Sequence, residues 1–187
     1  MRYKEYNPNS VLEKSIPLFW EHGFGGCAIK EIVEATGVNR FSLYQEFEDK
    51  EGILYSALNL YHERYNQPNL AILKKDVPIR ALLIKFYDSY LSDHPQHPPG
   101  CFTIHIATEL GDANKKVKSV LDAFISQLHE LLMAALIKHK STKERAQFYT
   151  EQLIALFCTS VCFSVIQSNS ERKAFIENGL NVILKDL

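Results

Sequence analysis

The clearest signals of local structure in this sequence lie in residues 18–54, LFWEHGFGGCAIKEIVEATGVNRFSLYQEFEDKEGIL. Two short segments with helical spacing of apolar residues, at about 28–36 and 40–47, are separated by Gly37. Glycine readily adopts the positive φ of a tight turn, so Gly37 is expected to end the first helix. Asn39 is a good N-cap for the second helix, and Val38 is spaced to pack against Leu43. This pattern predicts a helix-turn-helix unit.

Helices are also expected on both sides of this unit. The preceding helix is expected to start at Asn9 or Ser10, which can cap it, and to end before Gly23. Pro17 lies inside it and lacks an N–H group, so we expect a kink or a late start. The following helix is expected at about residues 50–65, with Pro68 ending it. The apolar faces are Val11, Leu12, Ile16, Phe19 and Trp20 in the first, and Ile53, Leu54, Leu58 and Tyr61 in the second.

The second helix of the unit has a face that suits DNA. Leu43 and Phe47 point inward, which leaves Arg40, Phe41, Tyr44 and Gln45 on the exposed side. In a helix-turn-helix the second helix enters the major groove, where arginine pairs with guanine and glutamine with adenine. Lys50 adds a positive charge at the next helix start, where backbone N–H groups favour phosphate. The alternative is a helical hairpin with a solvated face, which would be rich in Glu and Lys.

This stretch resembles the N-terminal domain of the TetR family of bacterial regulators. The resemblance covers about the first third of the chain, without gaps, and it implies an N-terminal DNA-binding domain, a helical second half, a homodimer and an operator with inverted repeats. It implies that Tyr44 and Lys50 touch phosphate. The residues that carry it are Leu18-Phe19, Gly23-Phe24, Ile32, Gly37-Val38, Leu43-Tyr44, Phe47 and Lys50-Glu51.

Two positions depart from the family's pattern. Cys27 stands where a threonine usually caps the second helix and touches phosphate, which weakens one backbone contact. Phe41 stands where a small residue is usual, which is expected to change the operator sequence that is read. The candidate DNA-binding residues are Lys30, Asn39, Arg40, Phe41, Ser42, Tyr44, Gln45 and Lys50.

The rest of the chain is expected to be helical, because no segment alternates as a half-buried strand does. We predict an all-α fold with a helix-turn-helix DNA-binding domain at residues 1–50 and a helical effector-binding and dimerisation domain at residues 51–187. The Pro-rich segment 93–100, DHPQHPPG, interrupts the second domain. Its helices are expected at residues 78–92, 101–110, 115–140, 143–168 and 171–187.

Charge and composition limit the interpretation. The net charge is −1, and residues 1–55 hold six basic against nine acidic side chains, so DNA binding rests on local geometry and not on a basic surplus. No signal peptide is visible at residues 1–9, which predicts a cytoplasmic protein whose four cysteines are reduced. The apolar run 153–166 is shorter than the ~20 residues that span a bilayer, so no membrane partner is expected.

The last two helices are apolar on more than one side, which predicts that a second copy covers them. The alternative to a dimer interface is that this apolar surface belongs to the central helix of a monomer. Cys158 and Cys162 in this region are expected to be core residues. The candidate dimer residues are Phe157, Val161, Phe175 and Leu180.

A small-molecule pocket is expected among the helices after residue 78. Cys101 follows Pro98-Pro99-Gly100 at a helix start, where the helix dipole would lower the pKa of its thiol and make it reactive towards electrophiles. The surrounding PPGCF…ATEL stretch also resembles a TetR subgroup that senses electrophiles or oxidants there; Cys27 is the rival thiol. The candidate effector or sensor residues are Cys101, Tyr87, Tyr90, His105, Glu109 and Phe124.

Competing functions leave weaker signatures. His94, His97 and Cys101 are spaced as three ligands of a soft metal ion, although loop histidines are usually only solvated. No GxGxxG, P-loop, HExxH or GxSxG motif occurs, so we expect neither an enzyme nor a cofactor. A motif-free helical enzyme or a helical protein-interaction scaffold remains the alternative to a repressor.

Overall fold

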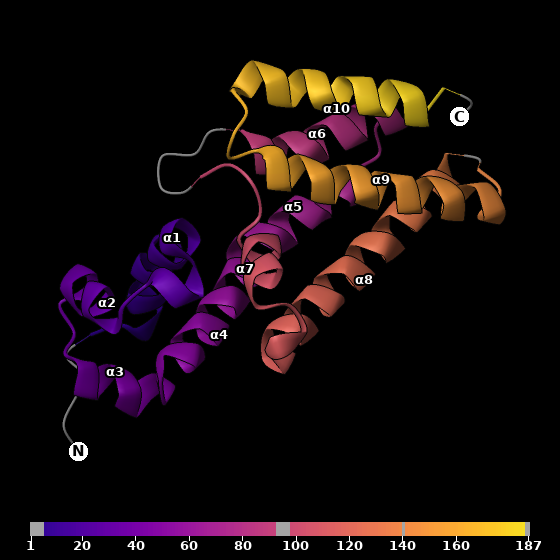
Figure 1. Ribbon diagram of the computed structural model, residues 1–187. Helices are drawn as coiled ribbons and strands as arrows, with labels where there is room; N and C mark the ends of the chain where they lie inside the picture. The colour runs from indigo at the N-terminus through magenta and orange to yellow at the C-terminus, as the bar shows by residue number, and fades with distance from the viewer. Residues whose placement is uncertain (1–5, 93–97, 140, 186–187) are drawn as a thin grey trace.

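The fold is helical throughout the part of the chain that is described. The structure is a computed structural model that describes residues 6–92, 98–139 and 141–185. Within these ranges there is no strand, which confirms the all-α prediction. The first three helices lie at one end of the molecule and a larger helical group at the other, joined by a long diagonal helix (Figure 1).

The first helix, α1 (Pro8–Gly26), starts earlier than predicted and is interrupted at Gly23, next to its predicted end. Its N-cap is Asn7, whose side chain accepts a hydrogen bond from the Asn9 N–H at 2.9 Å, and not Asn9 or Ser10. The predicted irregularity at Pro17 is wrong, because the helix continues through it. The kink lies at Gly23, whose φ of 70° is accessible to glycine at little cost.

The helix-turn-helix unit has the predicted geometry. Helix α2 (Ile29–Thr36) ends at Gly37, which has a φ of 73°, and α3 (Arg40–Phe47) follows. The Asn39 side chain caps α3 by accepting a hydrogen bond from the Ser42 N–H at 2.9 Å. Leu43 and Phe47 are buried, so the opposite side of α3 faces outward.

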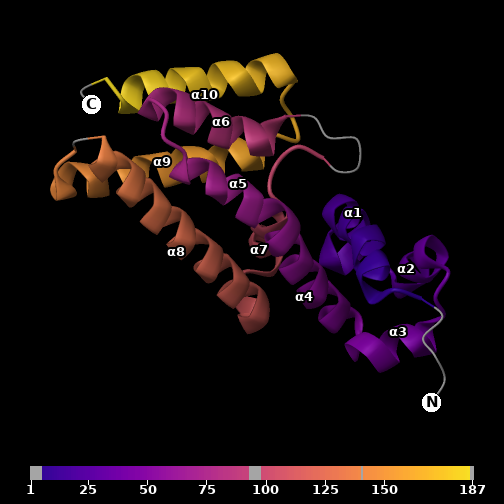
Figure 2. The same ribbon diagram turned by 180° about the vertical axis from the view of Figure 1, so that it is seen from behind.

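A long helical segment leads away from this unit. It consists of α4 (Lys50–Tyr61), a wider turn at His62–Asn66, α5 (Gln67–Ala71) and a final tight turn at Ile72–Lys74 (Figure 2). The prediction that Pro68 ends the helix is wrong. Pro68 stands in the first turn of α5, directly after the wide turn, where a missing N–H is tolerated.

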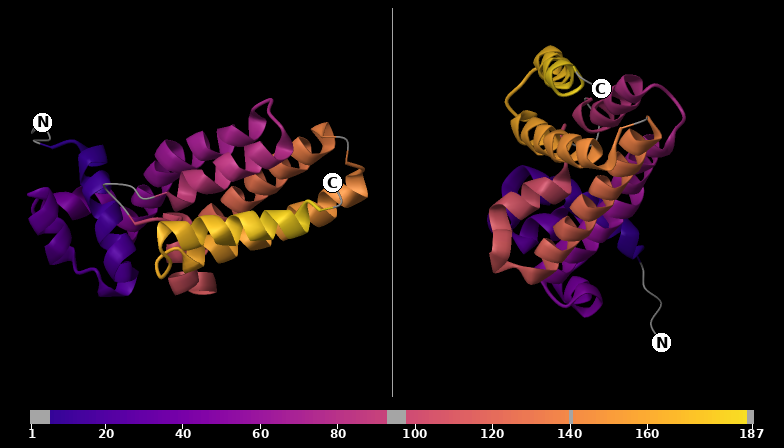
Figure 3. Two further views of the ribbon diagram at one scale, coloured as in Figure 1. Left: turned by 90° about the horizontal axis from the view of Figure 1, so that it is seen from above. Right: turned by 90° about the vertical axis from the view of Figure 1, so that its right-hand side faces the viewer.

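The larger group contains α6 (Ile79–Leu91), α7 (Phe102–Leu110), a short turn at Gly111–Ala113, α8 (Lys115–Lys138), α9 (Lys143–Phe163) and α10 (Asn169–Ile183). Helices α9 and α10 lie side by side with α6 at the end far from α3 (Figure 3). Helix α4 packs against α1 and α3 and also against α7 and α8, so it belongs to both parts. The domain boundary at residue 50 therefore stays a prediction.

One long helix is notably apolar. Among the described residues, α8 alone has the length and composition of a membrane-crossing helix. It packs against α7 and α9, and its residues Phe124, Leu128 and Leu132 are buried in the core. A buried core helix passes the same test, so this finding is weak support for a membrane segment.

Candidate DNA-binding face and domain junction

The outward side of α3 gathers most of the residues expected to read DNA. Arg40 is exposed, and its guanidinium carbon lies 5.0 Å from the centre of the Tyr44 ring. Phe41 is 77% exposed, although it is a large apolar side chain. Asn39 and Gln45 are exposed on the same element. The fold thus presents an arginine, an aromatic ring and two amides at one end of the molecule.

The other candidates near α3 have different surroundings. Ser42 and Tyr44 are half-buried, and the Ser42 carbonyl accepts a hydrogen bond from the Tyr6 hydroxyl at 3.0 Å. Lys30 lies on α2 with its side chain 83% exposed, 3.6 Å from the Glu34 carboxylate. Contact of any of these residues with DNA stays a prediction.

Lys50 is placed differently from the expectation. Its ammonium donates hydrogen bonds to the carbonyls of Phe24 at 2.7 Å and Cys27 at 3.0 Å. The same nitrogen lies 4.3 Å from the centre of the Phe24 ring. Two of its three N–H groups are therefore used to hold the end of α1, and a phosphate contact can use only the third.

The start of α4 explains how Lys50 reaches this turn. The Asp49 side chain caps α4 by accepting a hydrogen bond from the Gly52 N–H at 2.7 Å. A side chain at position 52 would collide with the Phe47 carbonyl, so only glycine allows this close approach of α3 and α4. The cap and the glycine fix the direction in which Lys50 leaves the helix.

Glu109 binds the same turn from the other domain. Its carboxylate accepts hydrogen bonds from the backbone N–H groups of Phe24 at 2.7 Å and Gly25 at 2.8 Å. A Cβ atom at Gly23 would lie 2.7 Å from the Glu109 Oε2 atom, so the carboxylate fits closely against the kink. Glu109 was expected to line an effector pocket, and the structure instead makes it a link between α7 and the end of α1.

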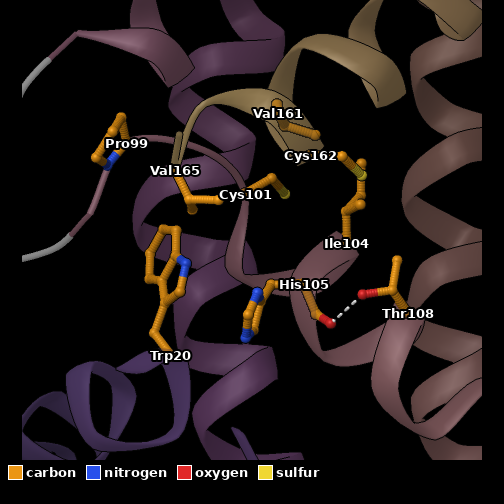
Figure 4. A pocket seen from close by; sticks show the side chains of 9 residues that line it. All are labelled: Trp20, Pro99, Cys101, Ile104, His105, Thr108, Val161, Cys162 and Val165. Carbon is orange, nitrogen blue, oxygen red and sulfur yellow. Dashed lines mark hydrogen bonds between the residues drawn. The ribbon is translucent and has the colours of Figure 1, made fainter. Parts of the chain in front are cut away.

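A cavity lies where α1, α7 and the end of α9 meet, and we call it the junction cavity (Figure 4). Its volume is about 110 Å³, and an adjoining hollow of about 540 Å³ shares Trp20, Pro99, His105 and Val165 with it. Of the predicted effector residues, only Cys101 and His105 are part of its wall. The junction cavity is lined by Trp20, Pro99, Cys101, Ile104, His105, Thr108, Val161, Cys162 and Val165.

Cys101 does precede a helix, since it is the N-cap residue of α7. The expected lowering of its pKa is wrong, because burial raises the pKa of this thiol to about 12 and outweighs the nearby backbone N–H groups. The side chain is 2% exposed, and its thiol donates to the Asn66 Oδ1 atom at 3.9 Å. Gly100, with a φ of 126° and Ser164 close by, allows the chain to turn into this buried position.

The other thiols have contrasting surroundings. Cys27 is buried, and its pKa is raised by burial first and by Glu31 second. Burial also raises the pKa of Cys158, which is half-buried. Cys162 is exposed and lines the junction cavity, so its expected core position is wrong. The outward side of α9 near its end is not covered by the protomer itself.

The remaining predicted pocket residues lie in the core. Tyr87, Tyr90 and Phe124 are each at most 3% exposed, and none of them lines the cavity or the adjoining hollow. Their rings pack with Phe86 and Phe157, and the Tyr87 hydroxyl donates to the Leu153 carbonyl at 2.7 Å. These aromatic residues pack in the core of the helical group, and their assignment to an effector pocket stays a prediction.

Three of the four predicted dimer residues are also internal. Phe157, Val161 and Leu180 are at most 5% exposed in the protomer, so they cannot form its outer surface, whereas Phe175 is half-buried. The apolar residues that remain open on α9, the turn after it and α10 are Phe148, Phe163, Val165, Ile166 and Val182.

The comparisons with known proteins agree with this geometry. Residues 11–57 match the family model described as bacterial regulatory proteins, tetR family. A structure of the TetR family regulator CifR, a cysteine mutant with operator DNA, superposes with a TM-score of 0.79 at 18% identity, covering 96% of this chain and 98% of that one. This is the TetR fold.

Two of the named relatives are HTH-type transcriptional repressors. The chain is 30% identical to the HTH-type transcriptional repressor ComR of Escherichia coli K12 over 125 residues, which cover 63% of this chain and 60% of ComR. It is 25% identical to the repressor NemR of the same organism over 119 residues, which cover 62% and 60%. The matches thus span about three fifths of these relatives. The N-terminal segment and the fold are thus similar to those of TetR-family regulators.

Several residues of the junction between α1, α7 and the end of α9 were not predicted from the sequence. Trp20 was assigned only to the core, because nothing in a one-dimensional pattern places α1 against α7 and α9. Arg172 is 4% exposed and donates to the carbonyls of Leu91, Ser164 and Gln167. A lone arginine on an amphipathic helix gives no signal of such burial. His94 and His97 lie outside the described residues, and no cluster of three metal ligands is found within them.

Proposed function

We propose that this protein is a transcriptional repressor that binds operator DNA through the exposed face of α3. The observation that carries this proposal is the exposed set of Asn39, Arg40, Phe41 and Gln45 on one capped helix, inside the segment that matches the TetR family model. Arginine and glutamine have the donor patterns that read base edges in the major groove, and an exposed ring suits a thymine methyl group. CifR, which shares the fold, was solved with operator DNA.

The repressor acts as a homodimer in this proposal. Phe148, Ile166 and Val182 are 58%, 75% and 77% exposed, and a second copy of α9 and α10 would remove this apolar surface from water. An isologous contact through these two helices places both α3 helices for an inverted repeat. Such a protein works in the cytoplasm, where its operator is.

A signal received in the larger domain releases the repressor from DNA. The buried Cys101 is a poor reactive thiol in this conformation, because a thiolate is the nucleophile and burial disfavours it. Cys162 is the exposed thiol of the same cavity. A reversible small molecule in the junction cavity is therefore the form of signal that the geometry favours.

Footprinting on the DNA that flanks the protein's own coding region tests the proposal. We expect protection of an inverted repeat at nanomolar protein, with contacts on one side of the duplex. Arg40→Ala serves as the loss-of-contact variant and Lys173→Ala, exposed on α10, as its control. Binding that is equal on every sequence, or absent, would contradict a sequence-specific repressor.

A further inference from the structure

We propose that the junction cavity binds a compact, mainly apolar molecule that carries one hydroxyl group, and that Glu109 transmits this binding to the DNA-binding domain. The cavity lies between the two parts of the molecule, with Trp20 of α1 on one side and His105 of α7 on another (Figure 4). The binding step stands alone, whereas the transmission step rests on the proposed function.

The size of the cavity sets the size of the ligand. An apolar protein cavity of roughly 150 Å³ holds one benzene molecule. The junction cavity, at about 110 Å³, is slightly smaller, but the adjoining hollow of about 540 Å³ extends it past Val165. Val165 is 60% exposed, so this side offers a route from solvent. A single substituted ring therefore fits with its substituent toward the hollow.

The walls define the chemistry of the ligand. Trp20, Ile104 and Val161 supply apolar surface. Burial lowers the pKa of His105, which favours the neutral ring, and a neutral ring offers one donor and one acceptor. In the adjoining hollow the buried Gln167 Oε1 atom has no hydrogen-bond partner among the described residues, and it would accept a hydrogen bond from a ligand. A hydroxyl group can satisfy both side chains.

Two routes connect the cavity to the DNA-binding domain. The Trp20 ring packs on Tyr61 of α4 and Phe102 of α7, with ring centroids 5.5 and 5.6 Å apart. A ligand that displaces the Trp20 ring of α1 therefore also affects α4 and α7. His105 and Glu109 lie one turn apart on the same side of α7. A shift of His105 therefore moves the carboxylate that holds the backbone of Phe24 and Gly25.

The turn at residues 23–27 can pass this movement on. Glu109 holds its N–H groups from the larger domain, and Lys50 holds its carbonyls from the start of α4, immediately after α3. The two opposite charges thus fix one turn between the domains. Displacement of either contact changes the position of α3 relative to the larger domain, and in a dimer it changes the separation of the two α3 helices.

Trp20 is the single tryptophan of the chain, so its fluorescence reports on this cavity alone. We would titrate the full-length protein with benzyl alcohol and, as the matched ligand without a hydroxyl, with toluene. We expect a saturable change of Trp20 emission, with benzyl alcohol binding about fivefold more tightly, as one added hydrogen bond gives.

Val165→Phe fills the cavity and Ile137→Phe adds the same ring at an exposed position of α8. We expect benzyl alcohol to bind the first variant about tenfold more weakly and the second like the wild type. Emission that does not saturate, or that responds equally in the two variants, would show that the cavity is not a binding site.

The transmission step needs a measurement that a purely structural role of Glu109 would not alter. We expect benzyl alcohol to lower operator affinity of the wild type by about fivefold or more, as a typical coupling does. In Glu109→Ala the benzyl alcohol affinity should stay within about twofold while this effect on the operator disappears. In Glu109→Gln, which keeps one acceptor oxygen, the effect of benzyl alcohol on operator affinity should lie between those in the wild type and in Glu109→Ala. Glu177→Ala, at an exposed position of α10, should show the wild-type effect.

A Glu109→Ala protein that still releases DNA on adding benzyl alcohol would overturn the role of Glu109. If the wild type binds no operator at all, the proposed function fails, and the fluorescence titration still decides whether the cavity is a site.

Discussion

Lys50 gives the sharpest test of how the structure changes an expectation drawn from sequence. Lys50→Met removes the ammonium and keeps the length of the side chain. Two hydrogen bonds from a charged donor, at 2.7 and 3.0 Å, are lost. Such bonds are worth about 1.5–3 kcal/mol each, but Lys50 is half-buried and water can replace part of them, so we expect a loss of about 2 kcal/mol in the free energy of unfolding.

The contact of the ammonium with the Phe24 ring changes this figure little. A cation on an aromatic face contributes about 0.5–1 kcal/mol at an exposed site, and the methionine sulfur recovers part of it. Urea denaturation at constant pH measures the result as a lower midpoint with an unchanged slope.

Lys30→Met is the matched control for charge. Its exposed pair with Glu34 at 3.6 Å is worth at most about 0.5 kcal/mol, so stability should hardly change. If Lys30 contacts phosphate, the salt dependence of operator binding should fall by about one counterion. Lys50→Met, measured where it is fully folded, should keep most of the wild-type slope. A stable Lys50→Met protein that loses one counterion would refute the assignment of Lys50 to the turn.

Three further outcomes are expected. Arg40→Ala should lose about 1–3 kcal/mol of preference for the operator over random DNA in competition binding, and an unchanged ratio would remove Arg40 from the groove. Phe157→Ala should cost about 3–5 kcal/mol of stability without changing the sedimentation of the dimer, because Phe157 is buried in the protomer. Phe148→Glu should give monomers, because it places a charge on the exposed apolar surface. Monomers from Phe157→Ala and dimers from Phe148→Glu would return Phe157 to the interface. Burial raises the pKa of Cys101 from 9.0 to about 12, so the contribution of its protonated thiol to stability is full below about pH 9 and is lost as the pH rises toward 12. In urea titrations Cys101→Ala should therefore lose less stability at alkaline pH than the wild type. An equal loss in the two proteins would contradict the burial of this thiol.

Local chemistry made the helix-turn-helix unit predictable. Gly37, the Asn39 cap and the spacing of Leu43 and Phe47 act within a few residues, so the pattern alone places α2, α3 and the exposed side of α3. The all-helical second half followed from periodicity for the same reason. Pro68 was misjudged because a wide turn just before it removes the need for its N–H, and no local rule announces such a turn.

The site at the domain junction is different in kind, because its parts are brought together only by packing. Trp20, His105 and Val165 are far apart in sequence, and their meeting depends on how α1, α7 and the end of α9 cross. Periodicity shows that a side chain is apolar or turned inward, but not which helix it meets, so Phe157 and Leu180 looked like a dimer surface and proved to be core. The helix dipole at Cys101 was a correct local inference, and burial by distant elements outweighed it. The spacing of Glu109 predicted a pocket residue. In the tertiary structure its carboxylate accepts hydrogen bonds from backbone N–H groups more than eighty residues earlier in the chain, because electrostatic partners are set by proximity in space and not by distance along the sequence.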